Sequence, residues 1–209
     1  MKEAVKLSLA LAIICAVAAA ILAYANWKTE GPRRDAELKE RQAALKLVLP
    51  AFDNDPIGEA KTVQGVTYYP ARDAQGTLLG LAGEGSSSKG FGGEVKALVG
   101  LSLDGEILTV IIANHKETPG LGTQVTDRKQ PRMIWEIFSS KEAAGGLPPC
   151  EYLDRYAGKA AGVVGGSSFR VVKTQDEVSD SAVLAVSGAT VSSNAVADAV
   201  STICGVFTS

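Results

Sequence analysis

The chain has 209 residues, a formal net charge of −2 and 46% apolar residues. A chain this apolar is not intrinsically disordered, and without a strong positive field it does not gather nucleic acid. Once an apolar N-terminal segment and a helical stem are set aside, about 150 residues remain, enough for one ordinary domain with its own core.

The N-terminal segment has the length and composition of a membrane span. Residues 7–25 read LSLALAIICAVAAAILAYA without a charge, and about 20 apolar residues cross the hydrocarbon core of a bilayer. Tyr24 and Trp27 follow at the end where aromatic rings favour the membrane interface. We therefore expect a retained transmembrane anchor in residues 1–28. The alternative is a cleaved signal peptide, because residues 23–25 (AYA) resemble a small-x-small cleavage site.

A short helical stem is expected after the span. Gly31 and Pro32 are predicted to break the chain, and residues 33–49 then read as a helix that Pro50 ends. A mostly one-sided apolar face predicts that this stem, in residues 29–50, docks on the following domain; a solvated spacer is the alternative. The face consists of Leu38, Ala43, Leu45, Leu47 and Val48.

Residues 51–209 have the pattern of one α+β domain. Residues 94–103 and 106–113 flank Asp104-Gly105, which is a strong hairpin signal. The other predicted elements are strands at 62–69 and 77–82 around a turn at 72–76, strands at 169–172 and 183–186, and helices at 129–139 and 194–206. We expect a single N-terminal transmembrane helix followed by one domain with a mixed or antiparallel sheet and packed helices.

The cysteines and the histidine limit the metal chemistry. The three cysteines form no C-x-x-C pair, and one histidine excludes a two-histidine metal site, so no metal site is predicted. Cys15 lies in the apolar segment. Cys150 and Cys204 can form a disulfide if the domain lies outside the cytosol; two buried thiols are the alternative.

Residues 187–193 (SGATVSS) connect a predicted strand to a predicted helix. The first N–H groups of a helix have no intrahelical partner, and together with the helix dipole they attract anions. Gly188 and Ala189 leave room for a phosphate, and the hydroxyls of Thr190, Ser192 and Ser193 can donate hydrogen bonds. The alternative is an ordinary helix cap, since serine and threonine are favoured there for local reasons.

Two further segments are candidate ligand loops. Residues 115–122 (HKETPGLG) follow a predicted strand, and their simplest interpretation is a Pro-Gly turn with solvated charges. Residues 86–93 (SSSKGFGG) are either a flexible loop or a glycine-rich loop that wraps a ligand, with Phe91 against a ring. Residues 86–93 do not match the G-x-x-x-x-G-K-[ST] spacing of a phosphate-binding loop.

GFGGEV, HKETPGLG and SGATVSS, in this order, resemble the FMN-binding domain family. With one N-terminal span, the chain resembles the G subunits of Rnf electron-transport complexes, which are related to the C subunits of Na⁺-translocating NADH:quinone reductases. The resemblance extends from the span to the final helix.

The resemblance implies a covalent cofactor. In this family a threonine carries FMN through a phosphoester bond, made by a separate, magnesium-dependent flavin transferase from FAD; the matching residue is Thr190. The residues implied to shape the phosphate pocket are Ser187, Gly188, Ala189 and Ser193. Those implied to line the flavin site are His115, Glu117, Thr118, Gly120, Leu121 and Gly122, with residues 90–93 as a weaker correspondence. The family often has an acidic residue six positions before the threonine, where this chain has Leu184.

The function that the resemblance implies is electron relay within an Rnf-type ferredoxin:NAD⁺ oxidoreductase complex coupled to ion translocation. Its partners are the other membrane subunits, the flavin transferase and the lipid bilayer, and the chain is not a complete enzyme alone. The family places this domain on the outer, periplasmic face of the inner membrane, although Lys28, Arg33 and Arg34 after the span favour the opposite orientation. The alternatives are a flavin-free, membrane-anchored interaction or assembly domain and an exported hydrolase that uses a serine near His115.

Overall fold

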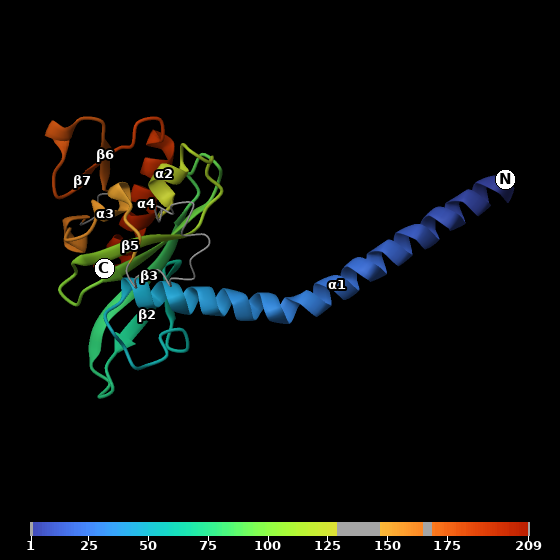
Figure 1. The fold of residues 1–209 in the computed structure, drawn as a ribbon, viewed down its shortest axis with the longest axis horizontal. Helices are drawn as coiled ribbons and strands as arrows, with labels where there is room; N and C mark the ends of the chain where they lie inside the picture. The colour runs from blue at the N-terminus through green and yellow to red at the C-terminus, as the bar shows by residue number, and fades with distance from the viewer. Residues whose placement is uncertain (1, 129–146, 165–168, 209) are drawn as a thin grey trace, which may run out of the picture. The chain divides into compact units, whose positions relative to one another are not determined.

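The computed structural model describes residues 2–128, 147–164 and 169–208 of the chain. The chain divides into two compact units, Met1–Ala43 and Ala44–Ser209. The first is helical, and the second contains a sheet with helices (Figure 1). The predicted helix at 129–139 lies outside the described residues, and the domain boundaries expected from the sequence stay predictions.

The helix α1 (Lys2–Val48) contains the predicted membrane span. Its apolar part has a mean hydropathy of 2.5 over an 18-residue window, and the large apolar side chains of that part are exposed. By length and composition this helix can cross a bilayer. Apolar side chains exposed all around a helix need lipid or protein beside them, so α1 indicates membrane association.

The predicted break at Gly31 and Pro32 is wrong, because α1 continues through both residues. A proline inside a helix removes one N–H donor and costs about 3 kcal/mol. The helix around Pro32 is exposed, so solvent can reach the carbonyl group that loses its partner. An ion pair between Glu30 and Arg34 joins the turns on either side, and the ribbon changes direction partway along its length (Figure 1).

The domain is built on a five-stranded antiparallel sheet in which each strand pairs with the next along the chain. This confirms the α+β prediction and the hairpin at Asp104-Gly105, where Gly105 has a φ of 80°. The strands are β1 (Lys61–Val63), β2 (Val66–Arg72), β3 (Leu78–Ser87), β4 (Val95–Leu101) and β5 (Ile107–Asn114).

The strand predicted at 62–69 is in fact two strands, since a tight turn at Gln64 and Gly65 separates β1 from β2. The φ angles of these residues are 49° and 84°, and two positive values are typical of a type I′ hairpin turn. The strand predicted at 77–82 is also longer than expected, because β3 continues to Ser87.

Helices cover both faces of the sheet. On one face α4 (Thr190–Phe207) packs against β3 and β4, where Gly83 and Gly85 leave room for Ile203. On the other face the last turn of α1 contributes its buried side chains to a second cluster; this cluster contains Leu45, Val48, Leu49, Tyr69, Ala71, Ala82 and Leu98. Of the predicted stem face, therefore, only the end docks, and Leu38 and Leu47 are exposed.

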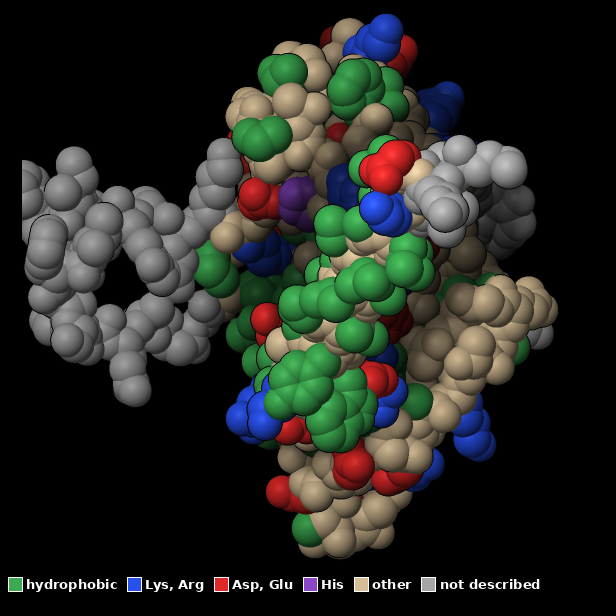
Figure 2. Space-filling view, turned by 90° about the vertical axis from the view of Figure 1, so that its right-hand side faces the viewer, with side chains coloured by type: hydrophobic (Ala, Val, Ile, Leu, Met, Phe, Trp, Pro, Cys, Tyr) green, Lys and Arg blue, Asp and Glu red, His purple; other side chains and the backbone are tan. Residues whose placement is uncertain are grey.

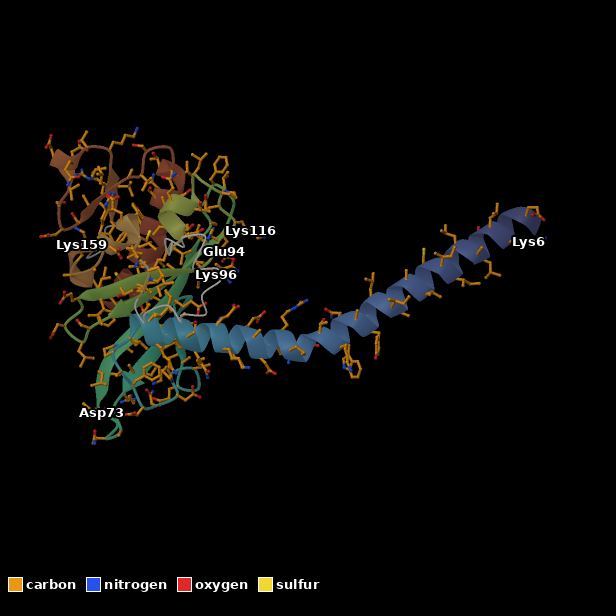
Figure 3. The ribbon with its side chains drawn as sticks, viewed as in Figure 1. Lys6, Asp73, Glu94, Lys96, Lys116 and Lys159 are labelled. Carbon is orange, nitrogen blue, oxygen red and sulfur yellow. The ribbon has the colours of Figure 1, made fainter. Side chains whose placement is uncertain are left out.

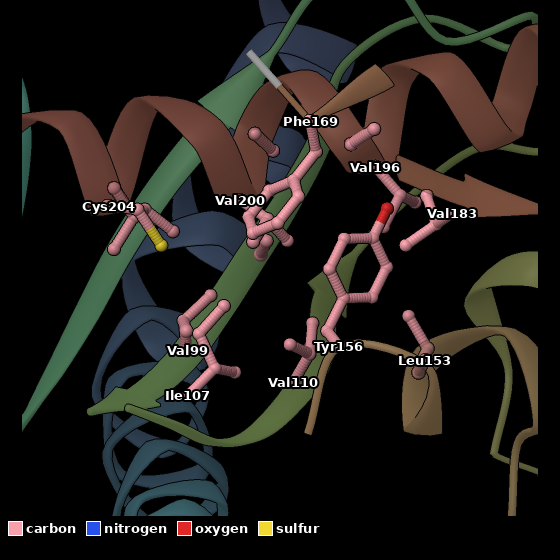
Figure 4. Packing of buried hydrophobic residues seen from close by; sticks show 14 of the residues in the cluster. Val99, Ile107, Val110, Leu153, Tyr156, Phe169, Val183, Val196, Val200 and Cys204 are labelled. Atoms are coloured by element: carbon pink, nitrogen blue, oxygen red, sulfur yellow. The ribbon is translucent and has the colours of Figure 1, made fainter. Parts of the chain in front are cut away.

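The remaining elements are short. They are α2 (Thr123–Thr126), α3 (Glu151–Asp154), the 3₁₀ helices η2 (Ala161–Val164) and η3 (Gln175–Glu177), and the parallel pair β6 (Arg170–Val172) and β7 (Ala182–Leu184). They complete the main core, in which the Tyr156 ring lies near Val183, Val196 and Phe169 (Figure 4). Tyr156 and Phe169 meet edge to face, with ring centroids 5.4 Å apart.

Two buried tyrosines connect α3 to the start of α4. The Tyr152 hydroxyl lies 3.0 Å from the Tyr156 hydroxyl and donates a 2.7 Å hydrogen bond to the Ser193 carbonyl. Burial raises the pKa of Tyr152 to about 12, so this hydroxyl keeps its proton and remains a donor. The first turn of α4, which begins with Thr190, is thereby fixed to the core.

Cys150 and Cys204 are buried free thiols in this structure, not a disulfide. Burial raises the pKa of Cys204 to about 12, so it stays a protonated, apolar-like side chain. Both residues therefore act in packing.

The buried end of α1 is expected to stabilise the domain. Leu45 is 0% exposed, so Leu45→Ala should lower the free energy of unfolding by about 2–5 kcal/mol. Leu47, on the same turn, is 46% exposed, and Leu47→Ala should change that free energy by no more than about 0.5 kcal/mol. Urea unfolding of the full chain in detergent, followed by circular dichroism, measures both. Equal effects would contradict the packing of this turn on the sheet.

Candidate functional site

The three motifs, far apart in the sequence, meet at one cavity of about 300 Å³. Phe91 comes from the glycine-rich loop after β3, four residues come from the loop after β5, and five come from the start of α4. The lining residues are Phe91, Glu117, Thr118, Leu121, Gly122, Gly188, Ala189, Thr190, Val191 and Ser192. A cavity of this size is at the lower end of the range for small-molecule sites.

The start of α4 is a sharp turn whose conformation requires glycine. Gly188 has a φ of 79°, and Ala189 follows as the residue before the helix. The Ser193 hydroxyl donates to the Ala189 carbonyl at 2.9 Å and accepts from the Val186 N–H at 3.2 Å. Ser193 thus fixes the turn from inside the protein and leaves half-buried Thr190 at the cavity.

The helix starts four residues earlier than predicted, so Thr190, Val191, Ser192 and Ser193 form its first turn. The N–H groups of such a turn lack intrahelical partners and carry the positive end of the helix dipole. The arrangement suits a phosphate at Thr190.

Glu117 links all three motifs. Its carboxylate is buried, with 6% of the residue exposed, and its Oε2 accepts a 2.6 Å hydrogen bond from the Ser192 hydroxyl. Its Oε1 accepts a longer, 3.4 Å bond from the N–H of Gly92. The interpretation of residues 115–122 as a turn with solvated charges is therefore wrong for Glu117, because this charge is inside the protein.

Close backbone contacts hold the glycine-rich loop against residues 116 and 117. A Cβ atom on Gly92 would lie 1.7 Å from the Lys116 carbonyl oxygen, and one on Gly90 would lie 2.6 Å from Glu117 Oε1. The same loop is tied to α4 by Asp198, whose carboxylate accepts from Lys89 Nζ at 2.6 Å and from the Ser87 hydroxyl at 2.7 Å. Burial alone would raise the Asp198 pKa, but these two donors outweigh it, and the pKa lies below its usual value.

His115 supports the loop after β5 and is not among the cavity-lining residues. Its Nδ1 accepts from the Glu117 N–H at 3.2 Å, and its Nε2 lies 2.7 Å from Asp127 Oδ1 and 3.3 Å from the Thr126 hydroxyl. The histidine is visible beside an acidic side chain, with hydrophobic groups higher on the same face (Figure 2). His115 therefore helps to fix the backbone of Glu117 through the hydrogen bond from the Glu117 N–H.

The structure brings together most of the residues expected at the site. Thr190, Gly188, Ala189, Glu117, Thr118, Leu121 and Gly122 line the cavity. Ser187 is exposed, Ser193 lies beneath the turn, and His115 and Gly120 belong to the supporting loop. Val191 also lines the cavity, and the sequence motifs do not predict this. Its place next to Thr190 would point to the cavity only if the helix were known to start at Thr190.

The residues present fit a planar aromatic ligand that carries a phosphate. Phe91, Leu121 and Val191 are exposed hydrophobic side chains at the cavity, suitable for contact with a ring system. The helix start supplies anion-binding N–H groups, and Thr118 and Thr190 supply hydroxyls. Among the described residues, no group of three or more His, Cys, Asp or Glu side chains has the arrangement of a metal site.

Comparisons with known proteins give a consistent result. The model of the FMN-binding domain matches residues 90–204, which is more than half of the chain. The chain is 38% identical over 125 residues to the G subunit of the ion-translocating oxidoreductase complex of Stutzerimonas stutzeri, a match that covers 56% of this chain and 54% of that protein. The chain therefore matches only about half the length of that relative.

Two other relatives are covered more fully. The G subunit of the Na⁺-translocating ferredoxin:NAD⁺ oxidoreductase complex of Acetobacterium woodii is 28% identical over 95% of this chain and 89% of its own length. The G subunit of the ion-translocating oxidoreductase complex of Methanosarcina acetivorans is 33% identical over 60% of this chain and 69% of its own length. The crystal structure of Shewanella oneidensis NqrC covers 80% of this chain and 68% of its own, with a TM-score of 0.49 and 24% identity.

The contact at Gly92 is expected to control the stability of the cavity wall. Gly92→Ala would put a methyl group into the Lys116 backbone and should lower the melting temperature by several degrees, as a loss of about 1–3 kcal/mol does. Gly162 has nothing within 4 Å of its Cβ position, so Gly162→Ala should leave the melting temperature nearly unchanged. Thermal melts of both variants in detergent compare them; an unchanged melt for Gly92→Ala would contradict the close approach.

Proposed function

Because the chain belongs to the FMN-binding domain family, we propose that it is a membrane-anchored flavoprotein that holds one FMN through a phosphoester bond to Thr190. The observation that carries the proposal is the convergence of the three motifs on one cavity beside the start of α4. FMN, when bound, supplies the electron-transfer chemistry, and the protein supplies binding, orientation and electrostatics.

The attachment uses the hydroxyl of Thr190 as the nucleophile. Thr190 Oγ1 forms a bond to the phosphorus of the FMN half of FAD, the bond from that phosphorus to the AMP half breaks, and AMP leaves while the hydroxyl proton passes to a base. A separate, magnesium-dependent flavin transferase catalyses this step. Afterwards the phosphate charge lies at the N-terminus of α4, where the N–H groups and the dipole favour it.

The chain acts as an electron relay within an Rnf-type, ion-translocating ferredoxin:NAD⁺ oxidoreductase. The complexes to which the S. stutzeri and A. woodii relatives belong support this assignment, as does a helix of the right length to anchor the domain in the bilayer. Its partners are the other membrane subunits of that complex. The chain is one station in the relay, since its sequence has no G-x-G-x-x-G dinucleotide motif after a strand.

The second candidate is a flavin-free interaction domain with the same fold. Leu184 favours it, because it replaces the acidic residue often found six positions before the acceptor threonine. Leu184 ends β7, and its carbonyl accepts a 2.5 Å hydrogen bond from Arg155, so its backbone is part of the packed structure. The two candidates differ in whether flavin stays with the denatured chain.

Covalent flavin is tested by co-expressing the full chain with a flavin transferase and viewing denaturing gels under ultraviolet light. The wild-type band should fluoresce, and Thr190→Ala should lose the fluorescence because it removes the nucleophilic oxygen. Thr190→Ser retains a hydroxyl and should keep part of it. Thr202→Ala, which removes an exposed hydroxyl of α4 outside the cavity, should keep all of it. A dark wild-type band would favour the flavin-free domain.

The domain is proposed to lie on the outer face of the membrane. A C-terminal alkaline phosphatase fusion should therefore be active, and a C-terminal green fluorescent protein fusion should be dark. Lys28, Arg33 and Arg34 oppose this orientation by the positive-inside rule, and neighbouring subunits supply the constraint that overrides it. An inactive phosphatase with a bright fluorescent fusion would show the reverse topology.

A further inference from the structure

Glu117 has the hydrogen-bonding pattern of an ionised carboxylate. Both of its oxygens accept, Oε2 from the Ser192 hydroxyl and Oε1 from the Gly92 N–H. A protonated carboxyl would instead donate from one oxygen. The group is 6% exposed, so this negative charge is held inside the protein at the wall of the cavity.

Among the residues that the structure describes, the charge of Glu117 has no basic side chain to neutralise it. Within the described ranges, no Lys, Arg or His forms an ion pair with it. Lys89 is paired with Asp198, and His115 faces Asp127 while its other ring nitrogen accepts from the Glu117 backbone. The carboxylate is stabilised by the Ser192 hydroxyl and the Gly92 N–H, and the positive end of α4 adds to their effect.

Water screens such a charge poorly, because it is buried between protein groups. Its field therefore extends into the cavity that Phe91, Leu121 and Val191 also line. A reducible group in that cavity gains electrons next to a fixed negative charge, which makes reduction less favourable.

We propose that Glu117 sets the reduction potential of the bound flavin, lowering it through its buried charge, and that Ser192 moderates this effect by donating to the carboxylate. The inference rests on the proposed function and deepens it. Glu117 and Ser192 are positioning residues: neither exchanges electrons, and both fix the electrostatic environment of the group that does.

Glu94 provides a matched contrast in the same part of the chain. It is a glutamate two residues beyond Gly92, but its side chain is 53% exposed and lies 3.9 Å from Lys96 Nζ. Lys116 is on the same side of the domain (Figure 3). Solvent and neighbouring cations weaken the field of Glu94, so neutralising it should leave the cavity unchanged.

The test measures the midpoint potential of the flavin by spectroelectrochemical titration of the full-length, flavinylated chain in detergent. Glu117→Gln keeps the shape and removes the charge, and it should raise the potential. A tenfold shift of the oxidised-to-reduced equilibrium, the expected size, corresponds to about 30 mV for a two-electron couple. Ser192→Ala leaves the carboxylate with one donor fewer and should lower the potential. Glu94→Gln should match the wild type.

The opposite directions of the two variants separate an electrostatic role from a structural one. The proposal would be overturned if the midpoint potentials of Glu117→Gln and Ser192→Ala shift in the same direction. It would also be overturned if both variants keep the wild-type potential. If Glu117→Gln does not incorporate flavin, Ser192→Ala decides alone, and a wild-type potential in that variant overturns it. Loss of flavin from both variants would also overturn it, since the pair would then only build the site. Absence of covalent flavin from the wild-type chain is a different result, because it contradicts the proposed function itself.

Discussion

The hydrogen bond between Ser192 and the buried carboxylate of Glu117 is the interaction on which the arrangement of the cavity depends. It joins the first turn of α4 to the loop after β5 at 2.6 Å, and the other carboxylate oxygen receives the N–H of Gly92 from the glycine-rich loop. A buried carboxylate without donors would cost several kcal/mol. The position of each of the three segments that line the cavity therefore depends on contacts with the other two.

The rest of the domain fixes the elements that carry this contact. The meander of β3, β4 and β5 places the glycine-rich loop and the loop after β5 at the same end of the sheet, because Lys96 pairs with Asn114. Tyr152 holds the Ser193 carbonyl, and Asp198 on α4 binds both Lys89 and Ser87. Helix α4 is thus hydrogen-bonded both to the core and to the glycine-rich loop, and these bonds fix the position of its first turn.

Much of the fold can be predicted from local signals. The Asp104-Gly105 hairpin, the final helix and the apolar span depend on turn chemistry and periodicity, which act over a few residues. The turn at Gln64-Gly65 escapes such prediction because Gln64 is an unusual residue for positive φ. The predicted break at Pro32 is wrong because an exposed helix can accommodate a proline.

The site is predictable in its motifs but not in its contacts. The small and hydroxyl residues in 187–193 indicate an anion-binding turn. Because the helix begins at Thr190 and not at Asn194, Ser192 lies in its first turn, where its side chain hydrogen-bonds to Glu117. That contact spans 75 residues of sequence. No local pattern distinguishes a glutamate that will be buried from one in a solvated turn, because its burial depends on the close approach of Gly92 to the backbone of Lys116.

The position of Glu117 also gives a physical reason for the covalent attachment proposed above. The carboxylate and a phosphate at Thr190 would both be attracted to the N-terminus of α4, and two negative charges near one helix end repel each other. A phosphate ester held only by hydrogen bonds would lose affinity through that repulsion, and more so where burial limits screening. The proposed bond to Thr190 would make retention independent of the repulsion. With that bond, a buried negative charge would be compatible with retention of the cofactor, whereas a site that relied on non-covalent phosphate binding would lose affinity through the same charge.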